Sequence, residues 1–101
     1  MQLIVALLML AWTHADNGYA LSDVFYVDGR EVGFVEVYRV GYPYDTTAWY
    51  AYAECDLRDG TVSKVFPSGH DPERQRAEAK VWLERVCPAE LSVLLDEKGT
   101  P

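Results

Sequence analysis

The pattern of hydrophobic and polar residues is typical of β-strands through the middle of the chain, from Ser22 to Phe66, where β-branched and aromatic residues are interrupted by turn dipeptides. Val24 to Val27 run into Asp28-Gly29, a dipeptide typical of hairpin turns. The segment from Glu31 to Val40 is again rich in β-branched and aromatic residues and supplies the returning strand. The sequence therefore predicts a first β-hairpin.

A second hairpin is predicted after the break at residues 42–45, where Pro43 belongs in a loop or at a sheet edge. Alternation is clearest from Thr47 to Leu57, followed by a turn at Asp59-Gly60 and a fourth strand from Thr61 to Phe66. The third strand would place Trp49, Ala51, Ala53, Cys55 and Leu57 on its core face and Tyr50, Tyr52, Glu54 and Asp56 on the other.

A helix is predicted after a loop over residues 66–70. Asp71 is a good N-cap, Pro72 suits the first helical position, and apolar residues then recur with helical spacing to Val86, with the charged residues between them left to solvent. Cys87-Pro88 should end the helix, because the residue before a proline is disfavoured in helical geometry, with one or two further turns before residue 95.

The predicted fold is α+β: a four-stranded antiparallel meander with one C-terminal helix packed across one face. Residues 16–95 would form this single domain, and residues 96–101 a flexible tail. The chain of 101 residues is long enough for one modest core and for no second domain.

The N-terminus has the layout of a secretory signal. Leu3 to Trp12 are uncharged and apolar, and both Thr13-x-Ala15 and Gly18-x-Ala20 offer the small residues that a signal peptidase reads. The apolar run is too short to span a membrane. No Lys or Arg precedes it, so residues 1–15 are either a signal peptide or an N-terminal core element of the domain.

Two cysteines, Cys55 and Cys87, lie in the predicted sheet and helix. In an exported protein they would pair as a disulfide that ties the helix to the sheet. In a cytosolic protein they would be two small buried thiols. The expected location is therefore secreted or periplasmic, with the cytoplasm as the alternative, and two cysteines without a nearby histidine pair do not predict a zinc site.

The charge is strongly acidic, with 16 Asp and Glu against 9 Lys and Arg and a net charge of −7. Such a field repels phosphate backbones and anionic membrane surfaces, so direct nucleic-acid binding is not expected. It favours a basic protein partner, although acidity also serves solubility alone.

Candidate catalytic residues are few. Ser68, His70 and Asp71 have the residue types of a hydrolase triad, but neighbours on one loop rarely converge as a triad must, and turn and capping roles explain them as well. Glu54 and Asp56 share a strand face and could serve as an acid and base pair, or simply be solvated. The sequence contains no nucleotide-binding, metal or cofactor motif, so no cofactor and no enzymatic activity are predicted.

Tyrosines and carboxylates form the most informative set of residues. Aromatic anchors mixed with acidic side chains are typical of a surface that binds basic proteins, although cross-strand tyrosines also stabilise sheets without binding anything. The predicted partner-binding residues are Tyr42, Tyr44, Tyr50, Tyr52, Glu54 and Asp56.

The leading hypothesis is a small acidic binding or inhibitory protein, exported and without enzymatic activity, that acts on a basic protein partner. One alternative is an intracellular inhibitor, such as one encoded by a phage, whose acidic surface occupies the nucleic-acid site of its target. Others are a small hydrolase that uses His70 and a carboxylate, and an assembly subunit that pairs through a strand edge. The sequence leaves the oligomeric state open.

Overall fold

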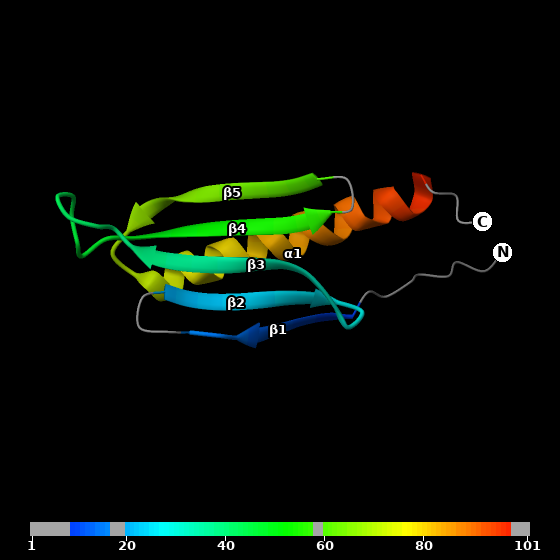
Figure 1. The fold of residues 1–101 in the computed structure, drawn as a ribbon, viewed down its shortest axis with the longest axis horizontal. Helices are drawn as coiled ribbons and strands as arrows, with labels where there is room; N and C mark the ends of the chain where they lie inside the picture. The colour runs from blue at the N-terminus through cyan, green and yellow to red at the C-terminus, as the bar shows by residue number, and fades with distance from the viewer. Residues whose placement is uncertain (1–8, 17–19, 58–59, 98–101) are drawn as a thin grey trace.

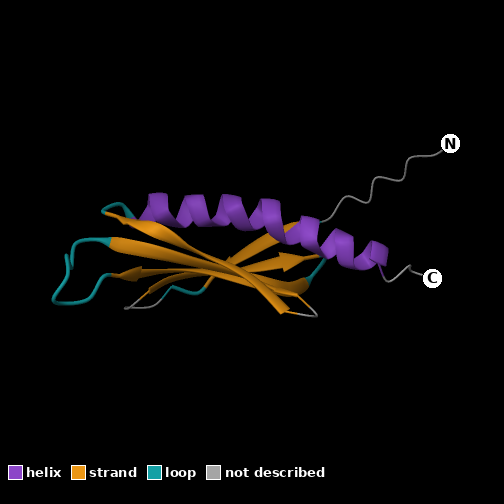
Figure 2. Cartoon of the chain, turned by 90° about the horizontal axis from the view of Figure 1, so that it is seen from above, coloured by secondary structure: helices purple, strands orange, loops and turns teal. Residues whose placement is uncertain are grey.

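A computed structural model of the chain describes residues 9–16, 20–57 and 60–97. Five antiparallel strands form one sheet in the order β1-β2-β3-β4-β5 (Figure 1). The helix α1 crosses one face of the sheet, and no described element covers the other face (Figure 2). The predicted α+β fold with a C-terminal helix is confirmed. The elements are β1 Leu10–His14, β2 Ala20–Val27, β3 Arg30–Arg39, β4 Trp49–Leu57, β5 Gly60–Gly69 and α1 Pro72–Glu97.

The sheet has one strand more than the four predicted, because β1 pairs with β2 at the edge of the sheet. The register runs from Leu10 opposite Val27 to His14 opposite Asp23. β1 also contributes to the interior, since the Trp12 ring lies 4.6 Å from the ring of buried Phe25. Part of the segment predicted as a signal peptide or core element is thus a strand in this fold, while residues 1–8 lie outside the described residues.

The turn between β2 and β3 has the geometry that its dipeptide predicts. Asp28 and Gly29 have φ values of 51° and 80°, which match the left-handed positions of a tight hairpin turn. Asparagine, aspartate and glycine tolerate these angles better than other residues, so the dipeptide suits the turn next to which Val27 pairs with Arg30; the β2–β3 register then shifts between Phe25 and Tyr26.

The outer strand β5 is longer than predicted. It extends past Phe66 to Gly69 and includes Pro67, which the sequence placed in a loop. Proline lacks a backbone donor, but a strand at the edge of a sheet has one side without a partner strand and can accept it. β5 is such an edge strand, because β4 is its sole neighbour among the described strands.

The core lies between α1 and the covered face of the sheet. The predicted core face of β4 is confirmed for Ala51, Ala53 and Cys55, which are fully buried together with Leu83 of α1. Gly33 of β3 makes this close packing possible: a Cβ there would lie 2.4 Å from the Glu54 carbonyl oxygen and 3.3 Å from Leu83 Cδ2. A larger residue at position 33 would displace both the helix and the neighbouring strand β4 from β3.

The two cysteines meet inside this core. The Sγ atoms of Cys55 in β4 and Cys87 in α1 lie 2.04 Å apart, at disulfide-bonding distance, and both residues are fully buried. The structure therefore brings together the pair that the sequence suggested, and the bond joins the sheet to the helix.

The helix begins where predicted and ends later. The Asp71 carboxylate accepts hydrogen bonds from the backbone N–H groups of Glu73 (3.1 Å) and Arg74 (3.2 Å), as an N-cap does. The predicted end at Cys87-Pro88 is wrong, because α1 continues through Pro88 to Glu97.

Residues 89–97 include three leucines, two glutamates and one alanine, all of which favour helix, and the helix continues past the proline despite its local cost. Two residues of the predicted tail, Asp96 and Glu97, are therefore helical, and residues 98–101 lie outside the described residues. No helix in the described ranges is both long and apolar enough to cross a membrane.

Candidate functional site

The uncovered face of the sheet carries an acidic aromatic patch. Val35, Val37, Ala51 and Ala53 point into the core, so the residues that alternate with them on β3 and β4 point away from α1. We define the acidic aromatic patch as these alternating residues. They are Phe34, Glu36 and Tyr38 of β3 and Tyr50, Tyr52, Glu54 and Asp56 of β4.

Rings and carboxylates are interleaved across the patch. The Tyr38 and Tyr50 rings lie 5.5 Å apart between centroids, and the Phe34 and Tyr52 rings lie 5.8 Å apart. These tilted contacts are the kind of cross-strand pair that stabilises a sheet. The register sets Phe34 opposite Glu54, Glu36 opposite Tyr52, and Tyr38 opposite Tyr50.

Phenol groups hold the carboxylates of the patch. The Tyr52 hydroxyl donates a hydrogen bond of 2.5 Å to Glu54 Oε1. Partial burial and a hydrogen bond to Glu36 together raise the pKa of Tyr38 to about 12, so this phenol stays protonated and remains a donor. The hydrogen bond from Tyr52 thus orients Glu54, its neighbour two residues away on the same strand.

Glu54 and Asp56 form a carboxyl pair at the end of the patch. A hydrogen bond with Glu54 raises the pKa of Asp56 to about 6, and the same contact lowers the pKa of Glu54. Two carboxylates held close together repel each other when both are ionised, so the pair retains one proton at a pH where an isolated aspartate has lost it.

No Lys or Arg of the described strands lies on this face. The basic residues of these strands are Arg30, Arg39 and Lys64. Arg39 is paired with Trp49 and Lys64 with buried Ala53, which places both on the helix side, and Arg30 lies at the hairpin turn opposite buried Val27. The acidic aromatic patch therefore has no positive neighbour in its own strand rows.

The predicted site residues divide into two groups. Tyr50, Tyr52, Glu54 and Asp56 share the patch, whereas Tyr42 and Tyr44 lie in the loop that joins β3 to β4, beyond the ends of the strands (Figure 1). Tyr42 is 91% exposed and Tyr44 is 75% exposed, so neither packs against the sheet.

Three residues of β3, Phe34, Glu36 and Tyr38, were missed as site residues. Their alternation with Val35 and Val37 was visible in the sequence and would have placed them on one face. Their position opposite the β4 tyrosines depends on the register between two strands, which the period of the pattern does not give.

The loop residues considered for catalysis have other partners. His70 Nε2 lies 2.8 Å from Asp45 Oδ2 in the β3–β4 loop, and both side chains are more than half exposed. Asp45 also accepts hydrogen bonds from the backbone N–H and hydroxyl of Thr47, which together with His70 lower its pKa to about 2. Asp71 instead caps the helix. The contact between His70 and Asp45 joins the loop before α1 to the β3–β4 loop.

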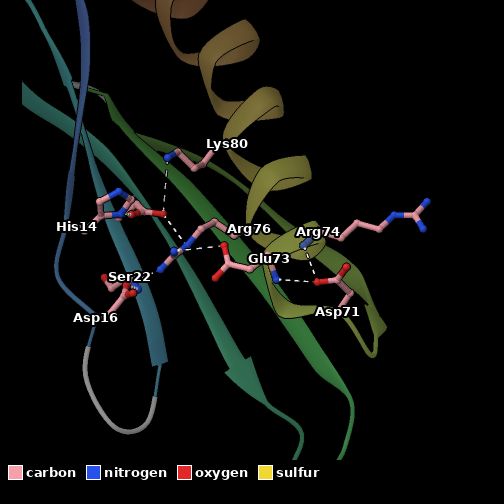
Figure 3. Close-up of polar contacts among 9 residues, drawn as sticks. His14, Asp16, Ser22, Asp71, Glu73, Arg74, Arg76 and Lys80 are labelled. Carbon is pink, nitrogen blue, oxygen red and sulfur yellow. Dashed lines mark hydrogen bonds and ion pairs between the residues drawn. The ribbon is translucent and has the colours of Figure 1, made fainter.

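A second polar cluster lies at the edge of the sheet, on the helix side, where side chains of α1 meet His14 and Asp16 (Figure 3). Asp23 is fully buried, and its Oδ2 atom lies 3.0 Å from Arg76 Nε and 3.9 Å from Lys80 Nζ. His14 contacts the other carboxylate oxygen, and Arg76 also binds Asp16, whose pKa it lowers. We call these five residues the Asp23 cluster.

The Asp23 cluster offers the ligand types of a metal site. Donor atoms of His14, Asp16 and Asp23 all lie within 4.8 Å of one another. Arg76 and Lys80, however, already supply a positive charge for each of the two carboxylates. A divalent cation would add charge beside two cations, so the contacts fit an ion-pair network that joins β1, β2 and α1 better than a metal site.

Comparisons of the chain with protein-family models, with curated proteins and with solved structures found no match.

Proposed function

We propose that the protein is a small acidic binding or inhibitory protein, without enzymatic activity, whose acidic aromatic patch docks on a basic protein partner. A single observation carries this proposal: a sheet face with four aromatic rings and three carboxylates is covered by no described element and has no basic residue in its strand rows. Half-buried rings supply apolar contact area, and the carboxylates supply charge complementarity.

The loop tyrosines extend the proposed surface. Tyr42 and Tyr44 lie at the end of the sheet that also holds Tyr38 and Tyr50, because the β3–β4 loop follows directly from Arg39. Exposed aromatic residues next to a patch of this kind are suited to anchoring a partner.

Affinity capture with matched charge variants tests the proposal. Glu36→Gln/Glu54→Gln removes two charges from the patch, and Glu73→Gln/Glu78→Gln removes two from the exposed side of α1. A partner captured by the wild-type protein from host fractions should be lost with the first variant and retained with the second. The purified partner should then bind the wild-type protein with the same dependence. Equal capture by the two variants would contradict the proposed surface.

We further propose that the protein is exported. The apolar N-terminal segment and the buried cysteine pair at disulfide-bonding distance both support a location outside the cytoplasm. The intact mass of protein expressed in its host tests this. A chain that starts at Asp16 or Leu21, and that gains two hydrogens on reduction, is the expected result.

An intracellular inhibitor is the second candidate. The observation that favours it is β1 itself, because cleavage after Ala15 would remove the strand whose Trp12 packs on Phe25. An uncleaved and fully reduced chain would support this candidate and contradict export. The acidic aromatic patch would then be the surface that occupies a nucleic-acid-binding site of the target.

A further inference from the structure

Basic side chains on the helix side of the sheet lie over aromatic rings. Arg39 lies 5.1 Å from the centre of the Trp49 ring, and Lys64 lies 4.9 Å from the centre of the Phe66 ring. Lys80 of α1 lies 4.7 Å from the Trp12 ring. These are the distances of cation–π contacts, so three rings on this side are already matched by cations of the same chain.

The rings of the acidic aromatic patch have no such partner among the basic residues of the described strands. Two of the four rings instead have a carboxylate directly across the strand pair: Glu36 lies opposite Tyr52, and Glu54 lies opposite Phe34. The Tyr52 phenol donates a hydrogen bond to Glu54 Oε1, and Tyr38 lies on the same strand face as Glu36, two residues away. The patch therefore presents oriented anions next to aromatic faces.

This combination suits a guanidinium group better than an ammonium group. A guanidinium is planar, stacks on aromatic rings, and donates two parallel hydrogen bonds to one carboxylate. An ammonium is a compact, strongly hydrated point charge, and its contacts on a flat open surface do little to offset the cost of removing its water.

The spacing of the two carboxylates also defines the shape of the ligand. Glu36 and Glu54 are diagonal neighbours on adjacent antiparallel strands, a relationship that separates side chains by about 7–8 Å. Alternate side chains of an extended segment are about 6.6–6.8 Å apart and point to the same side. Two arginines at positions i and i+2 of an extended segment can therefore reach both carboxylates.

We propose that the acidic aromatic patch recognises an extended, arginine-bearing segment of its protein partner, with guanidinium groups seated on Tyr52 and its neighbouring rings and bonded to Glu36 and Glu54. This inference rests on the proposed function and adds the chemistry of recognition to it. It predicts selection of arginine over lysine, which net charge alone does not produce.

The test uses two synthetic peptides with identical charge and length, Arg-Thr-Arg-Thr-Arg-Thr-Arg and Lys-Thr-Lys-Thr-Lys-Thr-Lys, titrated calorimetrically into the full chain at physiological ionic strength. We expect the arginine peptide to bind about tenfold more tightly, because stacking and paired hydrogen bonds add up at the two carboxylates, Glu36 and Glu54. Glu36→Gln/Glu54→Gln should abolish this preference, and Glu73→Gln/Glu78→Gln should preserve it.

Two further variants separate the ring from the hydroxyl at Tyr52. Tyr52→Val removes the ring and replaces it with another residue that favours strands, so the preference for arginine should fall by about threefold. Tyr52→Phe keeps the ring and should retain most of the preference. Circular dichroism of each variant verifies that the sheet is intact.

Different failures point to different errors. Equal affinity for the two peptides, with loss of both in Glu36→Gln/Glu54→Gln, would overturn arginine recognition and leave the proposed binding surface standing. Binding that both double variants weaken equally would overturn the surface itself, because the peptides would then respond only to net charge.

Discussion

The indole of Trp12 donates a hydrogen bond of 2.7 Å from Nε1 to Glu84 Oε1, across 72 positions of the sequence. The same ring packs on Phe25 and lies under Lys80. Trp12 belongs to the edge strand β1 and Glu84 to the helix, so this contact closes the sheet edge against α1. This strand, from the segment predicted to be a signal peptide or a core element, is thereby joined to the domain through both its backbone and a side chain.

Substitution of Trp12 measures how much β1 stabilises the fold. Trp12→Phe removes the hydrogen bond and should lower the free energy of unfolding by about 1 kcal/mol. Trp12→Ala also removes the half-buried ring and should lower it by about 2–3 kcal/mol. Urea unfolding of the full-length chain is the measurement, with Thr13→Ala, an exposed β1 residue, as control. If Trp12→Ala unfolds like the control, β1 does not contribute to the domain in solution.

Asp23 gives a second prediction, because it is a fully buried carboxylate that faces Arg76 and Lys80. Asp23→Ala would leave the largely buried Arg76 guanidinium without its closest interior anion, and should lower the free energy of unfolding by about 3–5 kcal/mol. Replacing both partners, as in Asp23→Leu/Arg76→Met, should recover much of this loss because the largely buried Arg76 guanidinium is removed together with its partner, while Asp16 and Lys80, which also contact the pair, are more exposed than Arg76.

The matched control for this pair is Asp16→Ala. Asp16 also binds Arg76 but is 41% exposed, so its removal should cost less than about 1 kcal/mol. Chemical unfolding at neutral pH compares the three variants. A loss for Asp23→Ala as small as that for Asp16→Ala would mean that water or Glu73 compensates for the missing carboxylate.

The cysteine pair gives a third prediction. Cys55 and Cys87 are 32 positions apart, and closing a loop of that length stabilises a fold by about 3–4 kcal/mol through the restricted unfolded chain. Cys55→Ala/Cys87→Ala should lower the free energy of unfolding by about that amount, plus the effect of the small cavities left in the core. Urea unfolding without reductant measures the difference, and adding reductant should weaken the wild-type protein but not the double variant.

Local patterns predicted most of the fold. Alternation in β4 identified the core face that holds Ala51, Ala53 and Cys55, and Asp28-Gly29 identified the first turn, because each signal lies within a few residues. The helix start followed from Asp71 and Pro72 for the same reason. The helix end was wrong because a single proline was weighted above the helix-favouring residues that follow it.

Long-range contacts account for what the sequence did not show. Arg76 and Lys80 were expected in solvent, but their side chains are only 12% and 22% exposed because both reach Asp23 on a distant strand. Asp23 itself is a charged residue on the core face of β2. A pattern that assigns core positions to hydrophobic residues does not place an aspartate there. Three of the seven residues of the acidic aromatic patch were not predicted for a related reason, since the partners of Tyr50 and Tyr52 come from the register with β3.

The Glu54 and Asp56 pair makes the stability of the protein depend on pH. The pKa of Asp56 is raised from 3.8 to about 6, chiefly by its hydrogen bond with Glu54. An acid with a higher pKa in the folded state holds its proton more tightly when folded. Its contribution to stability is therefore complete below pH 4 and is lost as the pH rises through about 6.

The lowered pKa values of Glu54 and Asp16 act in the opposite direction, but they do so at a pH below their ordinary values near 4. Between pH 4.5 and pH 7, the Asp56 effect should therefore dominate the difference between wild type and Asp56→Asn. As the pH rises through that range, the urea midpoint of the wild-type protein should fall relative to that of Asp56→Asn. The control Glu78→Gln, which replaces an acid on α1, should follow the wild type. Parallel curves for wild type and Asp56→Asn would show that the two carboxyl groups titrate independently, and the patch would then keep its full negative charge down to about pH 4.5.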